Sequence, residues 1–216
     1  MKKIMLIPVL LFIVASASAQ SKLRLNGYAS YVFNDGFDEA NDVNTYYSGK
    51  VKGGLQWGGG FEFFTNPYYS LELMYLNKST TAPVDFRAGL TNPAKHEDFD
   101  VSLNYILLAG NRFKPMSNGK VEGFGGLMMG VVISDVKAPS TGESGSNTNF
   151  AWGGRIGANI WLSSRMGLRL STQILASTKA TGGDLYFSYY GPVVLEDYTT
   201  LWQYGLGGGL TFRLGK

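Results

Sequence analysis

The stretch GGGFEFFTNPYYSLELMYL, residues 58–76, contains two segments in which large apolar residues occupy every second position. Phe61 and Phe63 lie in the first segment, and the second runs from Tyr69 to Tyr75. Between them stands Thr-Asn-Pro, residues 65–67, and Asn and Pro favour turns. Alternation of this kind is typical of a β-strand with one apolar face. The stretch therefore predicts a β-hairpin with a short turn.

The same alternation recurs along the chain, in segments of about ten residues or more. In each segment, one of the two sets of alternate residues, here called a parity, is apolar and carries no charged residue. The segments lie near residues 22–33, 51–64, 68–77, 98–110, 120–133, 149–162, 167–178 and 199–214. In the fourth segment, Phe99, Val101, Leu103, Tyr105 and Leu107 form the apolar parity, and we expect it to face lipid.

The connections between these segments alternate in length. Long polar connections lie at 34–50, 78–97, 134–148 and 179–198, and shorter, turn-rich ones lie at 65–67, 111–119 and 163–166. An even number of strands with long loops at one rim and short turns at the other is the layout of an outer-membrane barrel. We therefore predict an all-β fold, an eight-stranded antiparallel transmembrane β-barrel with up-and-down meander topology.

The N-terminus predicts export. Lys2 and Lys3 precede a short apolar run and Ala-Ser-Ala-Ser-Ala, residues 15–19, which is the pattern of a secretory signal peptide. We expect residues 1–19 to be removed, leaving a barrel domain at 20–216 in the bacterial outer membrane. The mature chain then has 17 basic against 16 acidic residues, a balance that does not favour nucleic acid as a partner. The absence of Cys excludes disulfides and thiolate metal sites.

The stretch 58–76 and the closing GGGLTFRL, residues 207–214, resemble the small outer-membrane β-barrel family of the outer-membrane protein X, W and A type. The resemblance implies the lipid bilayer and lipopolysaccharide as surroundings, and the barrel-assembly machinery and periplasmic chaperones as partners during insertion. One departure is that the chain ends Leu-Gly-Lys instead of on an aromatic residue. The family also contains proteins that pass small or apolar solutes.

A secreted soluble barrel is the rival interpretation, because its strands alternate as well. Its second parity would then meet water, yet here that parity is rich in glycine, which suits a crowded lumen better. Aromatic residues also gather near the strand ends, as the girdles of a membrane barrel require. The predicted lipid-facing girdle consists of Tyr31, Phe33, Phe61, Phe63, Tyr69, Tyr75, Phe99, Phe150, Trp152, Trp202 and Phe212.

Charged residues of the second parity lie within a few residues of the short-turn ends. We expect a neutral lumen network of ion pairs formed by Arg24, Glu62, Glu72, Glu122, Arg169 and Arg213, which closes the barrel. The alternative is that these charges only fill the lumen and make it wettable. The polar lining is predicted to continue through Gln56, Asp100, Asn104, Arg155, Asn159, Gln173 and Gln203.

These features predict a non-enzymatic protein with a structural or surface-interaction role and a polar, plugged lumen. The alternatives are narrow passage of small or apolar solutes and, more remotely, lipid A modification. The only histidine is His96, with Ser79 and Ser102 as conceivable nucleophiles, although no motif marks them. We expect no catalytic residue, metal or cofactor. The long loops offer room for an extracellular ligand, and the aromatic run 185–190 predicts that the last two strands continue beyond the membrane.

Overall fold

The computed structural model describes residues 23–42, 45–88, 95–116, 119–178, 184–188, 191–195 and 200–214. The predicted signal peptide, residues 1–19, lies outside this part of the chain. Within the described residues, no helix is long and apolar enough to cross a membrane. The strands are β1 (Leu23–Val32), β2 (Asp35–Asp42), β3 (Thr45–Val51), β4 (Gly54–Asn66), β5 (Tyr69–Ala88), β6 (Lys95–Pro115), β7 (Val121–Lys137), β8 (Ser144–Trp161), β9 (Met166–Thr178), β10 (Asp184–Ser188), β11 (Gly191–Leu195) and β12 (Thr200–Leu214).

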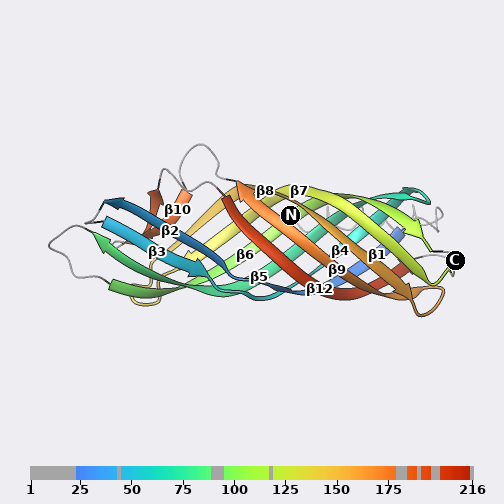
Figure 1. Ribbon diagram of the computed structural model, residues 1–216, viewed down its shortest axis with the longest axis horizontal. Helices are drawn as coiled ribbons and strands as arrows, with labels where there is room; N and C mark the ends of the chain where they lie inside the picture. The colour runs from blue at the N-terminus through green and yellow to red at the C-terminus, as the bar shows by residue number, and fades with distance from the viewer. Residues whose placement is uncertain are drawn as a thin grey trace, which may run out of the picture.

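Eight of these strands form a closed antiparallel barrel whose tilted strands wrap around one long axis (Figure 1). Neighbours in the ring follow the order β1, β4, β5, β6, β7, β8, β9 and β12. The last strand closes the ring on the first, with Leu25 opposite Phe212. Closure pairs every strand edge, which a bilayer requires because lipid offers no hydrogen bonds. The predicted fold class is therefore confirmed.

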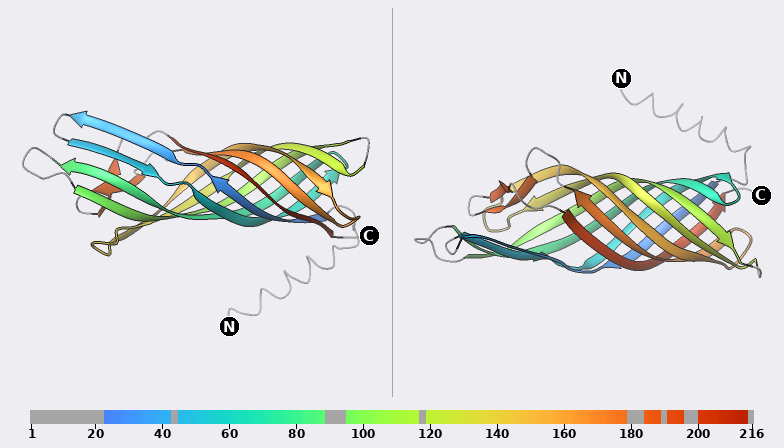
Figure 2. Two further views of the ribbon diagram at one scale, coloured as in Figure 1. Left: turned by 60° about the horizontal axis from the view of Figure 1, so that its bottom comes forward. Right: turned by 45° about the horizontal axis from the view of Figure 1, so that its top comes forward.

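The two ends of the barrel differ (Figure 2). At one end, the short-turn end, the connections are tight. Asn66 Oδ1 accepts hydrogen bonds from the backbone N–H groups of Tyr68 and Tyr69, at 2.9 and 3.1 Å, and so shapes the β4–β5 turn. At the β8–β9 turn, Ser163 Oγ accepts from the N–H groups of Arg165 and Met166. Both turns are built by side chains that mimic a backbone acceptor.

At the opposite, long-loop end, much of what the sequence suggests as loop is β-sheet. β5 and β6 extend far beyond the other strands, and the β2–β3 hairpin adds to the upper part of β5. The expected continuation of the last two strands through the aromatic run is wrong. β9 ends at Thr178 and β12 begins at Thr200, while Asp184–Ser188 pairs with Gly191–Leu195 in a separate two-stranded sheet.

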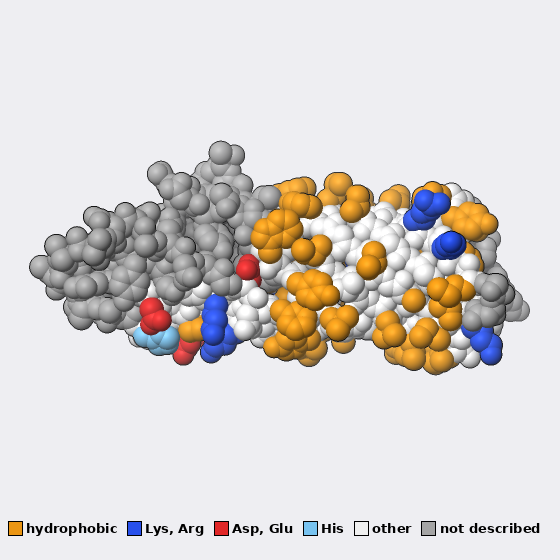
Figure 3. All heavy atoms as spheres, in the orientation of Figure 1, with side chains coloured by type: hydrophobic (Ala, Val, Ile, Leu, Met, Phe, Trp, Pro, Cys, Tyr) orange, Lys and Arg blue, Asp and Glu red, His pale blue; other side chains and the backbone are white. Residues whose placement is uncertain are grey.

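A band of exposed apolar side chains surrounds the half of the barrel nearer the short turns (Figure 3). Its upper limit is sharp on β5 to β8. One row of outward residues is Tyr75, Ile106, Val131 and Phe150. Two residues further along each strand the row is Asn77, Asn104, Ile133 and Thr148, and the next row contains Ser79, Ser102, Asp135 and Ser146. Tyr75 spans the limit by donating from its hydroxyl to Asn104 Oδ1 at 2.8 Å. The apolar band is the membrane-facing surface.

Most predicted girdle residues lie on this outward surface. Between 41% and 59% of the surface of each of these is exposed: Tyr31, Phe33, Phe61, Phe63, Tyr69, Tyr75, Phe150, Trp152 and Trp202. Phe212 is partly exposed. Trp152 and Trp202 both lie opposite Ala176, and their rings, 5.6 Å apart, cover it.

Phe99 is the exception, because it is 1% exposed and faces the barrel interior. The whole predicted parity of this strand is wrong: Val101, Leu103, Tyr105 and Leu107 are buried as well, while Ile106 and Leu108 face outward. For Phe99, Val101 and Leu103 the reason is that the upper part of β6 lies beyond the membrane band. There water is outside and the apolar side chains turn inward, as in a soluble barrel. Around Tyr105 and Leu107, by contrast, both parities are apolar and alternation does not mark the outward one.

The interior accordingly has two levels. Near the short-turn end it is polar and charged, with a small aromatic cluster of Phe64, Phe113 and Phe124. Toward the long-loop end it becomes an apolar core, in which the larger side chains are Met74, Leu76, Val84, Phe99, Val101, Leu103, Tyr105, Leu107, Met128, Val132 and Leu175. Side chains therefore fill the lumen at both levels, as expected for eight strands.

Candidate functional site

The polar level of the lumen contains a network of three arginines and three glutamates. Strand alternation places Arg24, Glu62, Glu72, Glu122, Arg155 and Arg169 on inward positions, and none is more than 7% exposed. Glu62 lies opposite both Arg24 and Glu72 in the strand register. Two carboxylates thus stand side by side, and like charges so placed repel each other unless cations approach them.

One ion pair lies close to the short-turn end. The Arg24 guanidinium donates to both carboxylate oxygens of Glu122, at 2.8 and 3.2 Å. It also stacks over the rings of Phe64 and Trp161, at 4.1 and 4.9 Å from guanidinium carbon to ring centroid. Asn159 Nδ2 donates to the same glutamate at 3.0 Å. The planar Arg fork is thus fixed by a bidentate pair and by aromatic faces.

Arg169 and Arg155 reach the two adjacent carboxylates from the other side of the lumen. Arg169 Nη2 donates to Glu62 at 3.2 Å, and its Nη1 lies 3.6 Å from Glu72. Arg155 Nη2 forms a short hydrogen bond with Glu72. The Tyr28 hydroxyl accepts from both guanidinium groups, at 2.9 and 3.2 Å, and donates to Glu72. Tyr28 therefore joins the two ion pairs into one unit.

Neutral side chains complete the network. Asn26 donates to Glu62 and Glu72, and Asn111 donates to the same two carboxylates. Ser70 Oγ donates to Glu62 at 2.7 Å, while Asn111 Oδ1 accepts from Arg155. Buried ion pairs persist only when their remaining donors and acceptors are satisfied. In this network each of the six charged groups is hydrogen-bonded and the charges sum to zero, while Asn26 Oδ1 is a buried acceptor without a partner.

Arg213 lies apart from this network. Its guanidinium stacks over Trp161, 3.5 Å from the ring centroid, and donates to the backbone oxygen of Ser164 at 3.4 Å. It lies opposite Arg24 in the register, and repulsion between these like charges explains why only Arg24 takes Glu122. The structure thus brings together five of the six residues predicted for the network.

Arg155 takes part in the network, although the sequence predicted it only as part of the polar lining above the network. The alternation in 149–162 marks it as inward, but the reach of its long side chain toward Glu72 is a three-dimensional property. Asn26, Tyr28 and Asn111 also take part, and no sequence motif distinguishes them. Asp100 and Asn104, predicted to line the lumen, face outward instead, because the parity of β6 is the reverse of the predicted one.

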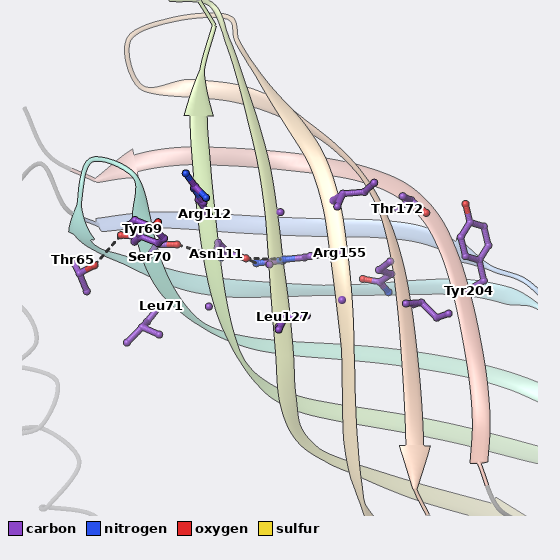
Figure 4. Close-up of a pocket in the computed structure, with 17 residues that line it drawn as sticks. Thr65, Tyr69, Ser70, Leu71, Asn111, Arg112, Leu127, Arg155, Thr172 and Tyr204 are labelled. Carbon is purple, nitrogen blue, oxygen red and sulfur yellow. Dashed lines mark hydrogen bonds between the residues drawn. The ribbon is translucent and has the colours of Figure 1, made fainter.

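A groove near these residues lies on the outer wall. It encloses about 950 Å³ and crosses β5 to β9 and β12 at outward glycines, Gly110, Gly125 and Gly154. Figure 4 shows Asn111 and Arg155 meeting beneath it, joined by a hydrogen bond of 3.2 Å. The groove lies on the membrane-facing wall, and most of its exposed lining is apolar, so in a bilayer lipid chains would pack against it.

The geometry around His96 does not form a nucleophilic triad. His96 Nδ1 lies 2.7 Å from Asp85 Oδ1, and both side chains are more than half exposed. Ser79 and Ser102 lie opposite each other, six residues along β6 from His96, or roughly 20 Å away. No group of three or more metal-binding side chains lies close together in the described part of the chain.

Comparisons with known proteins agree with this architecture. No protein-family model matches the sequence, and no curated protein matches it. Among solved structures, outer membrane protein OprG from Pseudomonas aeruginosa is similar with a TM-score of 0.56 and 14% identity, over 90% of this chain and 97% of that one. Neisserial surface protein A is similar with a TM-score of 0.54 and 10% identity, over 89% and 97%. At such identities the likeness concerns the fold.

Proposed function

We propose that this chain, which has the fold of the small bacterial outer-membrane β-barrels, is a non-enzymatic structural or surface-interaction protein with a closed lumen. The observation that carries the proposal is the neutral network of three arginines and three glutamates, in which each charged side chain is paired and hydrogen-bonded. A conducting pore needs a water-filled path, whereas here charged pairs fill the lower lumen and apolar side chains fill the upper lumen.

The energetics of the network favour permanent closure. Breaking one buried pair leaves an uncompensated charge, at a cost of about 3–5 kcal/mol. Opening a path through the lumen would also separate the aromatic faces of Phe64 and Trp161 from Arg24. The network therefore acts as a structural plug, with the short-turn end toward the periplasm.

The long-loop end supports a role at the cell surface. β5, β6, β7 and β8 continue beyond the apolar band with polar outward rows, and the β2–β3 hairpin widens this sheet. A rigid sheet above the lipid provides a surface for an extracellular ligand or for lipopolysaccharide. Export through a signal peptide, periplasmic chaperones and the barrel-assembly machinery would bring the protein to this location.

The competing functions are narrow passage of small or apolar solutes and lipid A modification. Fractionation of cells and gel migration with and without boiling test the location and the folded barrel. Planar-bilayer recording of the purified protein then tests closure: we expect no large, steady conductance. Sustained single-channel currents in the native protein would contradict the proposed plug, and deacylation or acylation of lipopolysaccharide would contradict a non-enzymatic role.

Two matched variants test whether the network is what closes the lumen. Arg155→Met removes a network cation and should produce leak currents, whereas Arg112→Met removes an outward arginine from the membrane-facing wall and should produce none. Equal behaviour of both variants would mean that the network does not close the lumen.

A further inference from the structure

Lys78 on β5 is a buried cation that the network does not use. It is 0% exposed, and its Nζ has no hydrogen-bond partner. Among the described residues, the buried charged side chains are four cations, Arg24, Lys78, Arg155 and Arg169, and three carboxylates, Glu62, Glu72 and Glu122. The interior therefore carries one excess positive charge, and it resides on Lys78. An isolated buried ammonium is costly unless it is paired.

A second unpaired donor stands next to Lys78. Gln56 lies directly opposite Lys78 in the β4–β5 register, and both side chains face inward. Gln56 Oε1 accepts from Gln173 Nε2 at 2.5 Å and from Ser30 Oγ at 3.4 Å, while Gln56 Nε2 has no partner. Two adjacent buried donors, Lys78 Nζ and Gln56 Nε2, therefore have no hydrogen-bond acceptor.

Gln203 is a further buried donor, linked to the surroundings of Lys78 through Tyr105. Gln203 on β12 is 2% exposed, and its Nε2 is also unpartnered, whereas its Oε1 accepts from the Tyr105 hydroxyl at 3.1 Å. Tyr105 is the diagonal inward neighbour of Lys78, because Lys78 lies opposite Leu103 and residues of one parity share a face. The tyrosine thus connects the surroundings of Lys78 to Gln203.

One carboxylate acts on the ammonium from a distance. Asp35 influences Lys78 electrostatically, but Lys78 Nζ has no hydrogen-bond partner, and Asp35 Oδ2 accepts from the Trp202 backbone N–H. Gly54, on the inward face of β4, has no side chain to fill the space beside the Lys78 stem: a Cβ there would come within 4.0 Å of Lys78 Cε.

We propose that Lys78 and Gln56 form a buried binding site for one small monovalent anion, of the class of chloride or a simple carboxylate. The site offers donors only, and its single positive charge matches a single negative charge. An anion there would satisfy two otherwise unpaired donors at once.

The first test is anomalous diffraction from crystals of the purified barrel grown in sodium bromide. We expect a bromide peak in contact with Lys78 Nζ and Gln56 Nε2. A site that holds only ordered water, or nothing, would overturn the proposal. This measurement uses the native chain and does not depend on whether a variant folds.

The second test compares thermal unfolding midpoints in sodium chloride, sodium acetate and sodium gluconate at equal ionic strength. The native protein and the control Lys137→Met, which loses an exposed lysine, should gain stability in chloride or acetate, whereas Lys78→Met should not. A response to chloride identifies an inorganic anion, and a response to acetate alone identifies a carboxylate. The same response in all three proteins would count against the site.

Discussion

Replacing Arg169 by methionine tests whether the lumen network stabilises the barrel as a unit. Arg169 is 0% exposed and donates to Asn159, Tyr28 and Glu62, at 2.9, 2.9 and 3.2 Å. Methionine keeps much of the side-chain volume but removes the charge and all three hydrogen bonds. Glu62 and Glu72 would then have one arginine between them, so the network would hold one uncompensated negative charge.

The expected cost is about 3–5 kcal/mol, the value for breaking a buried pair by removing one partner. Unfolding of the refolded protein in lipid vesicles by guanidinium chloride, followed by tryptophan fluorescence, measures it. The control is Arg165→Met on the β8–β9 turn, where the arginine is exposed and the change should cost under about 0.5 kcal/mol.

A second substitution separates charge from packing. Adding Glu62→Gln to Arg169→Met removes the excess negative charge while an amide oxygen remains to accept from Ser70 and Asn111. We expect the double variant to recover at least about 1 kcal/mol relative to additive behaviour. If Arg169→Met costs no more than Arg165→Met, or if the two network substitutions are additive, the network is not the coupled unit described above.

Three further predictions concern other parts of the chain. Arg24→Met should lower the unfolding free energy by about 3–5 kcal/mol, and Arg213→Met by no more than about 1 kcal/mol; equal losses would contradict the separation of these two arginines. Gly209→Ala should prevent the heat-dependent gel shift of a folded barrel, since its Cβ would overlap the Gly27 carbonyl oxygen, whereas Gly110→Ala, with open space around it, should fold. Because the chain has no cysteine, Ser102→Cys and Leu108→Cys can be labelled on intact cells with a membrane-impermeant maleimide; only Ser102→Cys should react, and labelling of Leu108→Cys would refute the membrane limit at Asn104.

Much of the barrel can be predicted from the sequence, because most strands alternate cleanly. In 58–76, phenylalanine, tyrosine and leucine alternate with glutamate and glycine, so the outward face and the hairpin turn are unambiguous. The strand around Tyr105 is different. Tyr105-Ile106-Leu107-Leu108-Ala109 is apolar on both parities, and above it the apolar parity faces a dry interior instead of lipid. Alternation alone cannot tell these two environments apart.

The sequence predicts most of the residues that form the network, but not which of them pair with each other. Parity and depth identify Arg24, Glu62, Glu72, Glu122 and Arg169, since each is an inward charge near a short turn. They do not show that Arg155 reaches down to Glu72 or that Arg213 turns onto Trp161. Those outcomes depend on side-chain reach across the closed barrel and on like-charge repulsion between neighbours, which a linear pattern does not contain.

The length of β5 determines how far the barrel wall extends beyond the apolar band. From Asn77, at the limit of the apolar band, the strand continues to Ala88. Eleven residues at about 3.3 Å each, tilted by roughly 40° as barrel strands are, rise by about 28 Å. The apolar core around Phe99 and Val101 packs behind this extended part of the sheet and supports it. In the proposed orientation, a ligand or surface that approaches from outside would therefore contact this extended sheet before it reached the lipid.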